Sequence, residues 1–353
     1  MPDKKIKIVE AARLKGFRAL AWQGDYLYGS RGYRLLRLLL IGPGINHQHS
    51  EEVAFFDPGR WNNACAANRI FLRLLRLGIH SLKFLPGSGM IAVAAKNIIL
   101  LEPGQREFRS VFKVRRGTRP LGLAVTPQGA VYWGEYFDNP SRREVRIYGS
   151  LDQGKNWQVV YAFPGKGVRH VHNIFYDAFA DCFWVLTGDR DAESKIIKAS
   201  LDWKKLEIVL EGGQQNRAAA LIIQKDFILY ATDTPCEQNR IYLLEKKSGL
   251  KKEVCLLPGP SMYSAQSGAG LFFSTAAEPG EVYHDHACIF GSRDGTCWEK
   301  LIAWEKDRMH PKYFQFGNIS LPAGVAPADY LAATGVAVKN EDGNTTIWKI
   351  EEY

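Results

Sequence analysis

The sequence predicts an all-β protein, a seven-bladed β-propeller with four strands in each blade. Many short runs of β-branched and aromatic residues are separated by Gly and Pro turns, which is typical of sandwiches and propellers. Strands that begin near a basic residue recur every ~40–60 residues, a spacing that suits propeller blades. No low-complexity linker divides the 353 residues, so we expect one domain over residues 1–353.

The innermost strands carry this repeat. Most begin with Arg or His and then become apolar, as in "GFRALAW" and "GVRHVHNIF". The seven candidate segments begin at Gly16, Gly78, Gly117, Gly167, Gln215, Ser261 and Gly317. The last blade lacks one strand, and "KKIKIVE" near the N-terminus is expected to supply it, so that the ring closes without an open sheet edge.

One segment does not fit the repeat. The stretch Trp61–Leu77 lacks strand alternation, and its apolar residues Ile70, Phe71, Leu74 and Leu75 fall at helical spacing. We therefore expect a helical insertion, over residues 59–77, between the first two blades.

The turn "SLDQGKNW" predicts how third and fourth strands are joined. Asp152 can accept hydrogen bonds from the backbone N–H groups of its own turn, Gly154 can adopt a positive φ, and Trp157 can cover the hairpin. A shortened copy and a degenerate copy span Ser292–Trp298 and Ser200–Leu206. All three turns are expected to be structural.

Composition narrows the possible partners. The net charge of +9 favours an anionic partner, whereas dispersed basic residues and the lack of a recognised motif argue against nucleic acid. No apolar run is long enough to span a bilayer, and no signal-type segment follows the N-terminus, so we expect no membrane association. Six scattered cysteines without CxxC spacing predict free thiols in a reducing compartment. We therefore expect a cytoplasmic monomer without a cofactor.

The chemistry is expected on one face of the disc. In an antiparallel hairpin the start of one strand lies beside the end of the next. Basic residues that open inner strands should therefore meet the carboxylates that close second strands. The predicted substrate-binding residues are Arg18, His80, Arg119, Arg169, Arg217, Asp189, Asp233 and Tyr136, and the catalytic candidates are His170, His172, Tyr263, Glu135 and Glu278. Arginine forks bind carboxylates in bidentate fashion, which favours a uronic or sialic acid; the alternative is a ring of internal salt bridges.

His170 and His172 form the densest element. They lie two residues apart in a predicted strand and should project to one face. One can act as a general base or neutralise a carboxylate, or the pair can be structural. Both can instead bind a metal if Asp189 or Asp191 supplies a third ligand, although the predicted site contains none. The run "YHDHAC", with His284 and His286, is metal-like in composition but is expected to be an exposed polar loop.

These turns resemble the Asp-boxes of BNR-repeat propellers in the sialidase-like superfamily, and the chain is similar to uncharacterised BNR-repeat and glycosyl-hydrolase-like proteins. In "FRAL" the resemblance gives Arg18 the role of gripping the substrate carboxylate, with Arg169 and Arg217 completing an arginine trio and Tyr263 as nucleophile. The paired histidines look more like propeller polysaccharide lyases, in which a His or Tyr base removes the C5 proton of a uronate.

The expected function is therefore hydrolysis or β-elimination of an acidic glycan that contains uronate or sialate. It is expected at the face of the disc where the inner strands begin, which we name the funnel face. The alternative is a non-catalytic propeller that binds a glycan or a protein partner on the same face.

Overall fold

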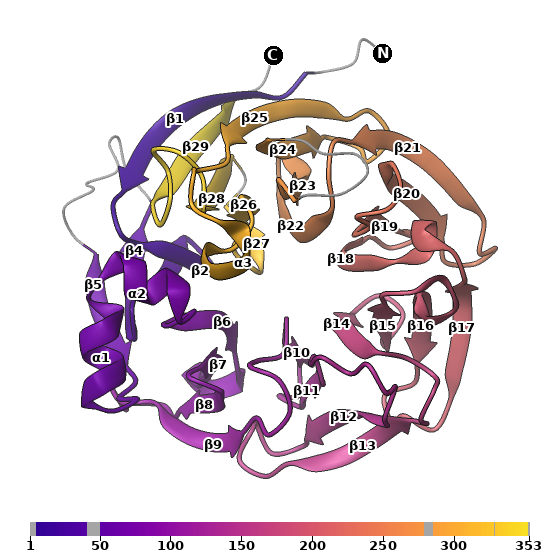
Figure 1. The fold of residues 1–353 in the computed structure, drawn as a ribbon, viewed down its shortest axis with the longest axis horizontal. Helices are drawn as coiled ribbons and strands as arrows, with labels where there is room; N and C mark the ends of the chain where they lie inside the picture. Colours follow the sequence, from indigo (N-terminus) through magenta and orange to yellow (C-terminus); the bar gives the residue numbers. More distant parts are fainter. Residues whose placement is uncertain (1–4, 41–49, 279–284, 328, 352–353) are drawn as a thin grey trace.

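The computed structural model describes residues 5–40, 50–278, 285–327 and 329–351. Seven antiparallel sheets are arranged in a ring around a central axis (Figure 1). The predicted all-β, seven-bladed architecture is confirmed. Within each blade the strands run in chain order from the axis outward, except at the seam.

The first four blades follow one another without interruption of this order. Blades 1 and 2 are β2 (Arg18–Gln23), β3 (Tyr26–Arg31), β4 (Arg34–Leu39) and β5 (Glu51–Phe55), then β6 (Ile79–Phe84), β7 (Met90–Ala94), β8 (Asn97–Leu101) and β9 (Arg109–Lys113). Blades 3 and 4 are β10 (Ala124–Val125), β11 (Val131–Gly134), β12 (Val145–Ser150) and β13 (Gln158–Phe163), then β14 (His170–Asp177), β15 (Cys182–Gly188), β16 (Lys195–Ala199) and β17 (Leu206–Glu211).

The remaining blades complete the ring. Blades 5 and 6 are β18 (Ala218–Ile223), β19 (Phe227–Thr232), β20 (Asn239–Glu245) and β21 (Lys251–Leu257), then β22 (Ser261–Ser267), β23 (Gly270–Thr275), β24 (His286–Ser292) and β25 (Glu299–Glu305). Blade 7 is β26 (Asn318–Ser320), β28 (Tyr330–Val336), β29 (Thr345–Glu351) and β1 (Lys7–Leu14).

The ring closes through the N-terminal strand, as predicted. Strand β1 pairs antiparallel with β29, with Lys7 opposite Glu351 and Leu14 opposite Thr345. It forms the outer edge of blade 7 (Figure 1). Ala12 and Leu14 are buried, so the closing strand is packed as well as hydrogen-bonded.

The core lies between neighbouring blades. Between blades 3 and 4, the Tyr132 and Phe183 rings are 4.7 Å apart, and Phe183 stacks on Trp203 at 5.0 Å. Trp203 comes from the degenerate turn that begins at Ser200. Each sheet is thus apolar on both faces, and large aromatic side chains fill the wedge between blades.

The insertion lies between β5 and β6, as predicted, but consists of two short helices rather than one. These are α1 (Arg60–Ala66) and α2 (Arg69–Leu74). Asn68 separates them, because its side chain accepts hydrogen bonds from the N–H groups of Ile70 at 2.9 Å and Phe71 at 3.3 Å. Asn is a favoured N-cap residue, so it starts a new helix at this point.

The inner strands share a β-bulge near the funnel face. In blades 1, 2, 4, 5 and 6 the register shifts after the first one or two paired residues. The unpaired residues include His80 and His172, which therefore occupy equivalent positions. Bulges redirect side chains, and they are common next to active sites. In blade 3, Pro120 lacks an N–H donor, and only Ala124–Val125 of the predicted inner strand is present.

A segment after β26 lies along the inner strands, which the sequence did not predict. Ala323 exchanges backbone hydrogen bonds of 2.8 Å and 2.9 Å with Trp22 and Leu20 of β2. Strand β27 (Val325–Ala326) then pairs in parallel with the end of β22. Leu20 is the bulge residue of β2 and the other partners follow the bulges, so the segment lies against the parts of the inner strands away from the funnel face.

The other helical segments are short: α3 (Pro311–Phe314) and the single 3₁₀ turns Pro86–Ser88, Asp191–Glu193 and Gln214–Asn216. Within the described ranges, no helix combines the length and apolar character needed to cross a membrane.

Candidate functional site at the funnel face

The turns between third and fourth strands have the predicted structural geometry. Oδ1 of Asp152 accepts hydrogen bonds from the N–H groups of Lys155 and Asn156 at 3.2 Å and 2.9 Å. The Trp157 indole N–H donates to the Gly154 carbonyl at 3.0 Å, and Gly154 has φ of 87°. Burial opposes ionisation, but these hydrogen bonds lower the pKa of Asp152 to about 2. The carboxylate is thus satisfied by its own turn.

At the opposite face, His170, His172 and Asp189 form one cluster, which we name the His–Asp cluster. His170 begins β14 and pairs with Gly188, the last residue of β15, so Asp189 follows beside it. The Nε2 atoms of the two histidines are 3.1 Å apart, and each is 3.2 Å from Oδ1 of Asp189. The structure thereby supplies the third group that the sequence left open between Asp189 and Asp191.

The remaining ring nitrogens of the histidines contact backbone carbonyls. Nδ1 of His172 lies 2.8 Å from the Ala218 carbonyl oxygen, and Nδ1 of His170 lies 3.2 Å from that of Phe137. A carbonyl oxygen only accepts, so each Nδ1 carries the proton. In neutral imidazoles the lone pairs are then on the Nε2 atoms, which face each other and Asp189.

Two arginines hold Asp189. Nη1 of Arg169 is 2.8 Å from Oδ2 of Asp189, and its Nη2 is 2.6 Å from Asp138. Nη2 of Arg217 is 3.3 Å from Oδ1 of Asp189 and 3.7 Å from Asp233. Burial opposes ionisation of Asp189, but contacts with both histidines and Arg217 hold its pKa well below the usual range. Arg169 and Arg217 therefore meet at Asp189, whereas Arg18 contacts His80.

Glu278 and Asp233 are two further acidic residues beside the His–Asp cluster. We name this central part of the funnel face the mouth. Burial first, and then the charges of Asp233 and Asp189, raise the pKa of Glu278 to about 7. Burial also raises the pKa of Asp233, against the opposing charge of Arg217. Among the described residues, Glu278 has no hydrogen-bond partner.

Glu135 has a different environment. It is buried, and Arg116 binds both of its carboxylate oxygens, with Nε at 2.7 Å from Oε1. The Arg146 N–H also donates to Oε2 at 2.9 Å. Sequence reasoning missed Arg116, because nothing in the run "VRRG" distinguishes the arginine that points to Glu135. The predicted catalytic role of Glu135 stays a prediction.

Two tyrosines lie between the two sides of the mouth. The ring of Tyr136 is 4.2 Å from that of His170, between centroids. Burial first, and then Asp233 and Asp189, raise the pKa of Tyr136 to about 12. Tyr136 and Tyr263 both lie close enough to Arg119 to affect its pKa.

Arg18, His80 and Arg119 form a second group, which we name the Arg–His cluster. Nδ1 of His80 accepts hydrogen bonds from Nη1 of Arg119 at 2.7 Å and from Nη1 of Arg18 at 3.2 Å. Nε2 of His80 donates to the Arg76 carbonyl at 2.8 Å. Burial and the two arginines hold the pKa of His80 well below its usual value, so the ring is neutral. Burial, and then Arg18, lower the pKa of Arg119 to about 10.

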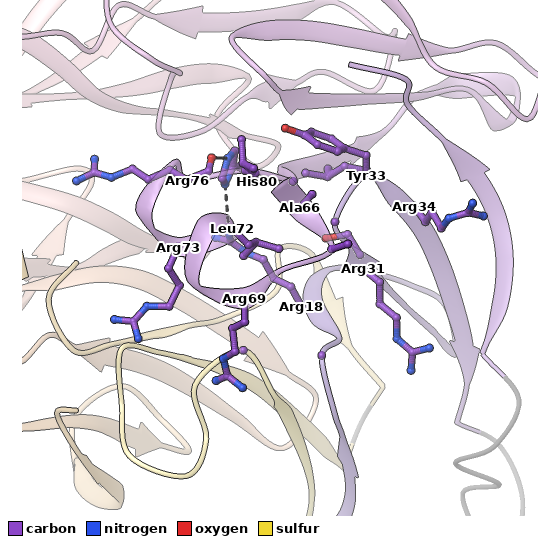
Figure 2. A pocket seen from close by; sticks show the side chains of 18 of the residues that line it. Arg18, Arg31, Tyr33, Arg34, Ala66, Arg69, Leu72, Arg73, Arg76 and His80 are labelled. Carbon is purple, nitrogen blue, oxygen red and sulfur yellow. Dashed lines mark hydrogen bonds between the residues drawn. The ribbon is translucent and has the colours of Figure 1, made fainter. Parts of the chain in front are cut away.

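Next to the Arg–His cluster, a cavity of about 810 Å³ lies against the α1–α2 insertion and blades 1, 2 and 7. Figure 2 shows Arg69, Arg73 and Arg76 on one side of it, with Tyr33 and Arg34 on the other. Arg18 and His80 also line it, so the cavity is continuous with the cluster.

The cavity contains more positive charge than its carboxylates neutralise. Arg69 and Arg73 are paired with Asp342, and Arg34 is paired with Glu52. Within the described part of the chain, the other cations that line it form no ion pair; they are Lys15, Arg18, Arg31 and Arg76. Sequence reasoning missed this cavity, although the basic residues of "RIFLRLLRLG" recur at helical spacing and were its available signal.

The second histidine-rich run, "YHDHAC", lies only partly within the residues that the structure describes. His284 lies outside the described residues, and His286 forms an exposed pair with Asp285, with Nδ1 2.5 Å from Oδ1. Within the described ranges, the groups that approach one another as metal ligands would are His170, His172 and Asp189.

Comparisons with solved structures show the propeller fold. The WD40 propeller domain of Doa1 superposes with a TM-score of 0.60 at 11% identity, covering 98% of this chain and 97% of that one. An oligogalacturonate lyase in complex with manganese gives 0.59 at 8% identity, with 98% and 96% covered. A chain of a mitotic checkpoint complex gives 0.59 at 9% identity, with 99% and 94% covered. No protein-family model matches the chain, and no curated protein matches its sequence.

Proposed function

We propose that the chain is an enzyme of the funnel face that cleaves a uronate-containing oligosaccharide by β-elimination. The observation that carries this proposal is the Arg–His cluster. Two half-buried guanidinium groups share one neutral imidazole, and neither has a carboxylate partner among the described residues. Such a pair is suited to an anionic ligand, because a carboxylate would supply the missing counter-charge.

The adjoining cavity favours an oligosaccharide with more than one acidic group. Lys15, Arg31 and Arg76 line it without an ion-pair partner among the described residues. A ligand carboxylate bound at Arg18 and Arg119 would leave space in the 810 Å³ cavity for a neighbouring acidic sugar. In this role Arg18 keeps the carboxylate-binding function that the sialidase-like resemblance gives it.

The carboxyl groups of the mouth favour elimination over hydrolysis. Glycosidases generally use two carboxyl groups, one as acid and one as base or nucleophile. Asp189 contacts two arginines and two histidines, and Asp233 is paired with Arg217. Glu278 is then the carboxyl group without a partner in the described structure. Elimination needs one base, one acid and a neutralised carboxylate, which this site can provide.

Residues of the mouth and of the Arg–His cluster can supply the charge neutralisation, the base and the acid that β-elimination requires. Arginines neutralise the C6 carboxylate, which makes the C5 proton more acidic. A base, for which His170, His172 and Tyr263 are candidates, removes that proton, and its electron pair forms the C4–C5 double bond. The C4–O bond breaks at the same stage, and the leaving oxygen takes a proton from an acid. Glu278 is suited to that role, because a pKa of about 7 keeps half of it protonated at neutral pH.

Two comparisons bear on this proposal in different ways. A structure with the same fold is an oligogalacturonate lyase, which is consistent with uronate chemistry on a propeller. The WD40 domain of Doa1 has the same fold too, which fits the alternative of a non-catalytic scaffold that binds a glycan or protein. At 8% and 11% identity, both comparisons concern the fold alone.

Calorimetric titration with galacturonate and glucuronate oligosaccharides tests the binding step. We expect binding of the acids, at least tenfold weaker binding of their methyl esters, and a similar loss in Arg119→Met. Arg34→Met is the matched control, because Arg34 lines the adjoining cavity but is already paired with Glu52. Equal affinity for acids and esters, or equal losses in both variants, would overturn the assignment.

A further inference from the structure

The His–Asp cluster presents three acceptor atoms to one point. Both Nδ1 protons are used by backbone carbonyls, so in the neutral rings Nε2 of His170 and Nε2 of His172 carry lone pairs. Oδ1 of Asp189 is the third acceptor, and the three atoms are separated by 3.1 Å, 3.2 Å and 3.2 Å. Three acceptors at this separation repel one another unless a proton on one imidazole or a cation lies between them.

We infer that His170, His172 and Asp189 bind one divalent transition-metal ion. Ligands at about 2.1–2.2 Å from an ion, at right angles, are about 3.0–3.1 Å apart, close to the observed triangle. Two imidazoles and a carboxylate on one face of an ion leave its other positions open to water or substrate oxygen.

The surroundings orient these ligands. The carbonyl oxygens of Phe137 and Ala218 fix the two rings by accepting from Nδ1. Arg169 binds Oδ2 of Asp189 at 2.8 Å and turns Oδ1 toward the histidines. Such outer contacts are the usual means of positioning metal ligands. His170 and His172 are buried, with 4% and 2% of their surface exposed, and Asp189 is half-buried, so the site is largely built before an ion arrives.

The local charge also accommodates a cation. Arg169 and Arg217 bring two positive charges to Asp189, but Arg169 is paired with Asp138 and Arg217 with Asp233. Asp189 then remains as the carboxylate whose charge a divalent ion can offset, joined by Glu278 when that group is ionised. Asp191 does not compete for the ion, because Gln214 donates to it at 2.7 Å.

A bound ion would polarise a ligand carboxylate, and because it would occupy Nε2 of both histidines, Tyr263 would remain as the candidate base. This role rests on the proposed function, whereas metal binding itself does not. The ion would act as a Lewis acid, adding to the arginines as a neutraliser of the substrate carboxylate.

Titration of the chelator-treated full chain with Zn²⁺ or Mn²⁺ alone tests the inference. We expect one ion per chain, with affinity falling at least about 100-fold in Asp189→Asn and His172→Gln and less than threefold in the matched control Asp191→Asn. Circular dichroism confirms that each variant is folded. Absence of binding by the folded wild type, or undiminished binding by both folded ligand variants, would overturn the inference.

Long-range ¹H–¹⁵N spectra of the wild type need no variant. Zn²⁺ should shift Nε2 of two histidines and leave both Nδ1 atoms protonated. A shift confined to other histidines would place the ion elsewhere and refute the inference. A chain that binds metal at these residues but does not act on uronates would refute the proposed function alone.

Discussion

Nη1 of Arg119 lies 2.7 Å from Nδ1 of His80, whose other nitrogen donates to the Arg76 carbonyl. This arrangement requires a neutral histidine that accepts from Arg119 and from Arg18 at once. The ring therefore holds two like charges together at the edge of the cavity. Under the proposed function, a ligand carboxylate would supply the counter-charge to these two arginines.

His80→Leu should disrupt the arginine pair, because the two guanidinium groups lose their shared acceptor. We expect at least tenfold weaker binding of a uronate oligosaccharide, measured by calorimetry. His80→Gln is the matched control, since an amide can accept from the arginines and donate to the Arg76 carbonyl. If Leu and Gln weaken binding equally, His80 does not act through its acceptor nitrogen.

Glu278 should make stability fall as pH rises. Its pKa is about 7 in the folded chain and about 4.3 when unfolded, so the folded state binds more protons between these values. Between pH 4.5 and 7 we expect a loss of about 1–3 kcal/mol in the free energy of unfolding, after allowing for solvent screening. Glu278→Gln should remove this part of the slope in denaturant titrations. An unchanged slope in the variant would contradict the raised pKa.

Asp152 should matter for stability and leave ligand binding unchanged. Its carboxylate accepts hydrogen bonds from two backbone N–H groups of its turn. Asp152→Ala should therefore lower the free energy of unfolding by about 1–2 kcal/mol. Asp202→Ala in the degenerate turn is the comparison, because that aspartate accepts from one backbone N–H group and is more exposed. A loss of uronate binding in Asp152→Ala would show that the turn face takes part in function.

The closing strand should contribute strongly to stability. Leu14 is 6% exposed between blades 7 and 1, so Leu14→Ala should cost about 2–4 kcal/mol in chemical denaturation. Val9 lies on the same strand but is 41% exposed, and Val9→Ala should change stability by about 0.5 kcal/mol or less. Equal effects would mean that β1 is not packed into the ring.

The repeat, the closure by β1 and the gathering of Arg18, His80, His170, His172 and Asp189 on one face were predictable from the sequence. Strand alternation and hairpin geometry are local rules that act on short segments. The pairing of these residues was not predictable. Which arginine meets Asp189, and which meets His80, depends on the contact between blades that are distant along the chain.

Three other features lay beyond local pattern. Asn68 divides the insertion into two helices through a capping interaction that the apolar spacing does not reveal. Arg116 reaches Glu135 from a loop without a periodic signal. The segment around Ala323 pairs with backbone groups of the inner strands β2 and β22. Because this pairing involves the backbone alone, no residue type in the sequence predicts it.

Digestion of a panel of uronate and sialylated oligosaccharides tests the central claim most directly, with new reducing ends and the ultraviolet absorbance of unsaturated uronates read together. The proposed β-elimination predicts both signals from a uronate substrate, and their loss in Arg119→Met. Reducing ends without absorbance would mean hydrolysis and contradict the mechanism. Neither signal from any sugar, together with a ligand-induced rise in melting temperature, would contradict catalysis and identify the chain as a binding propeller.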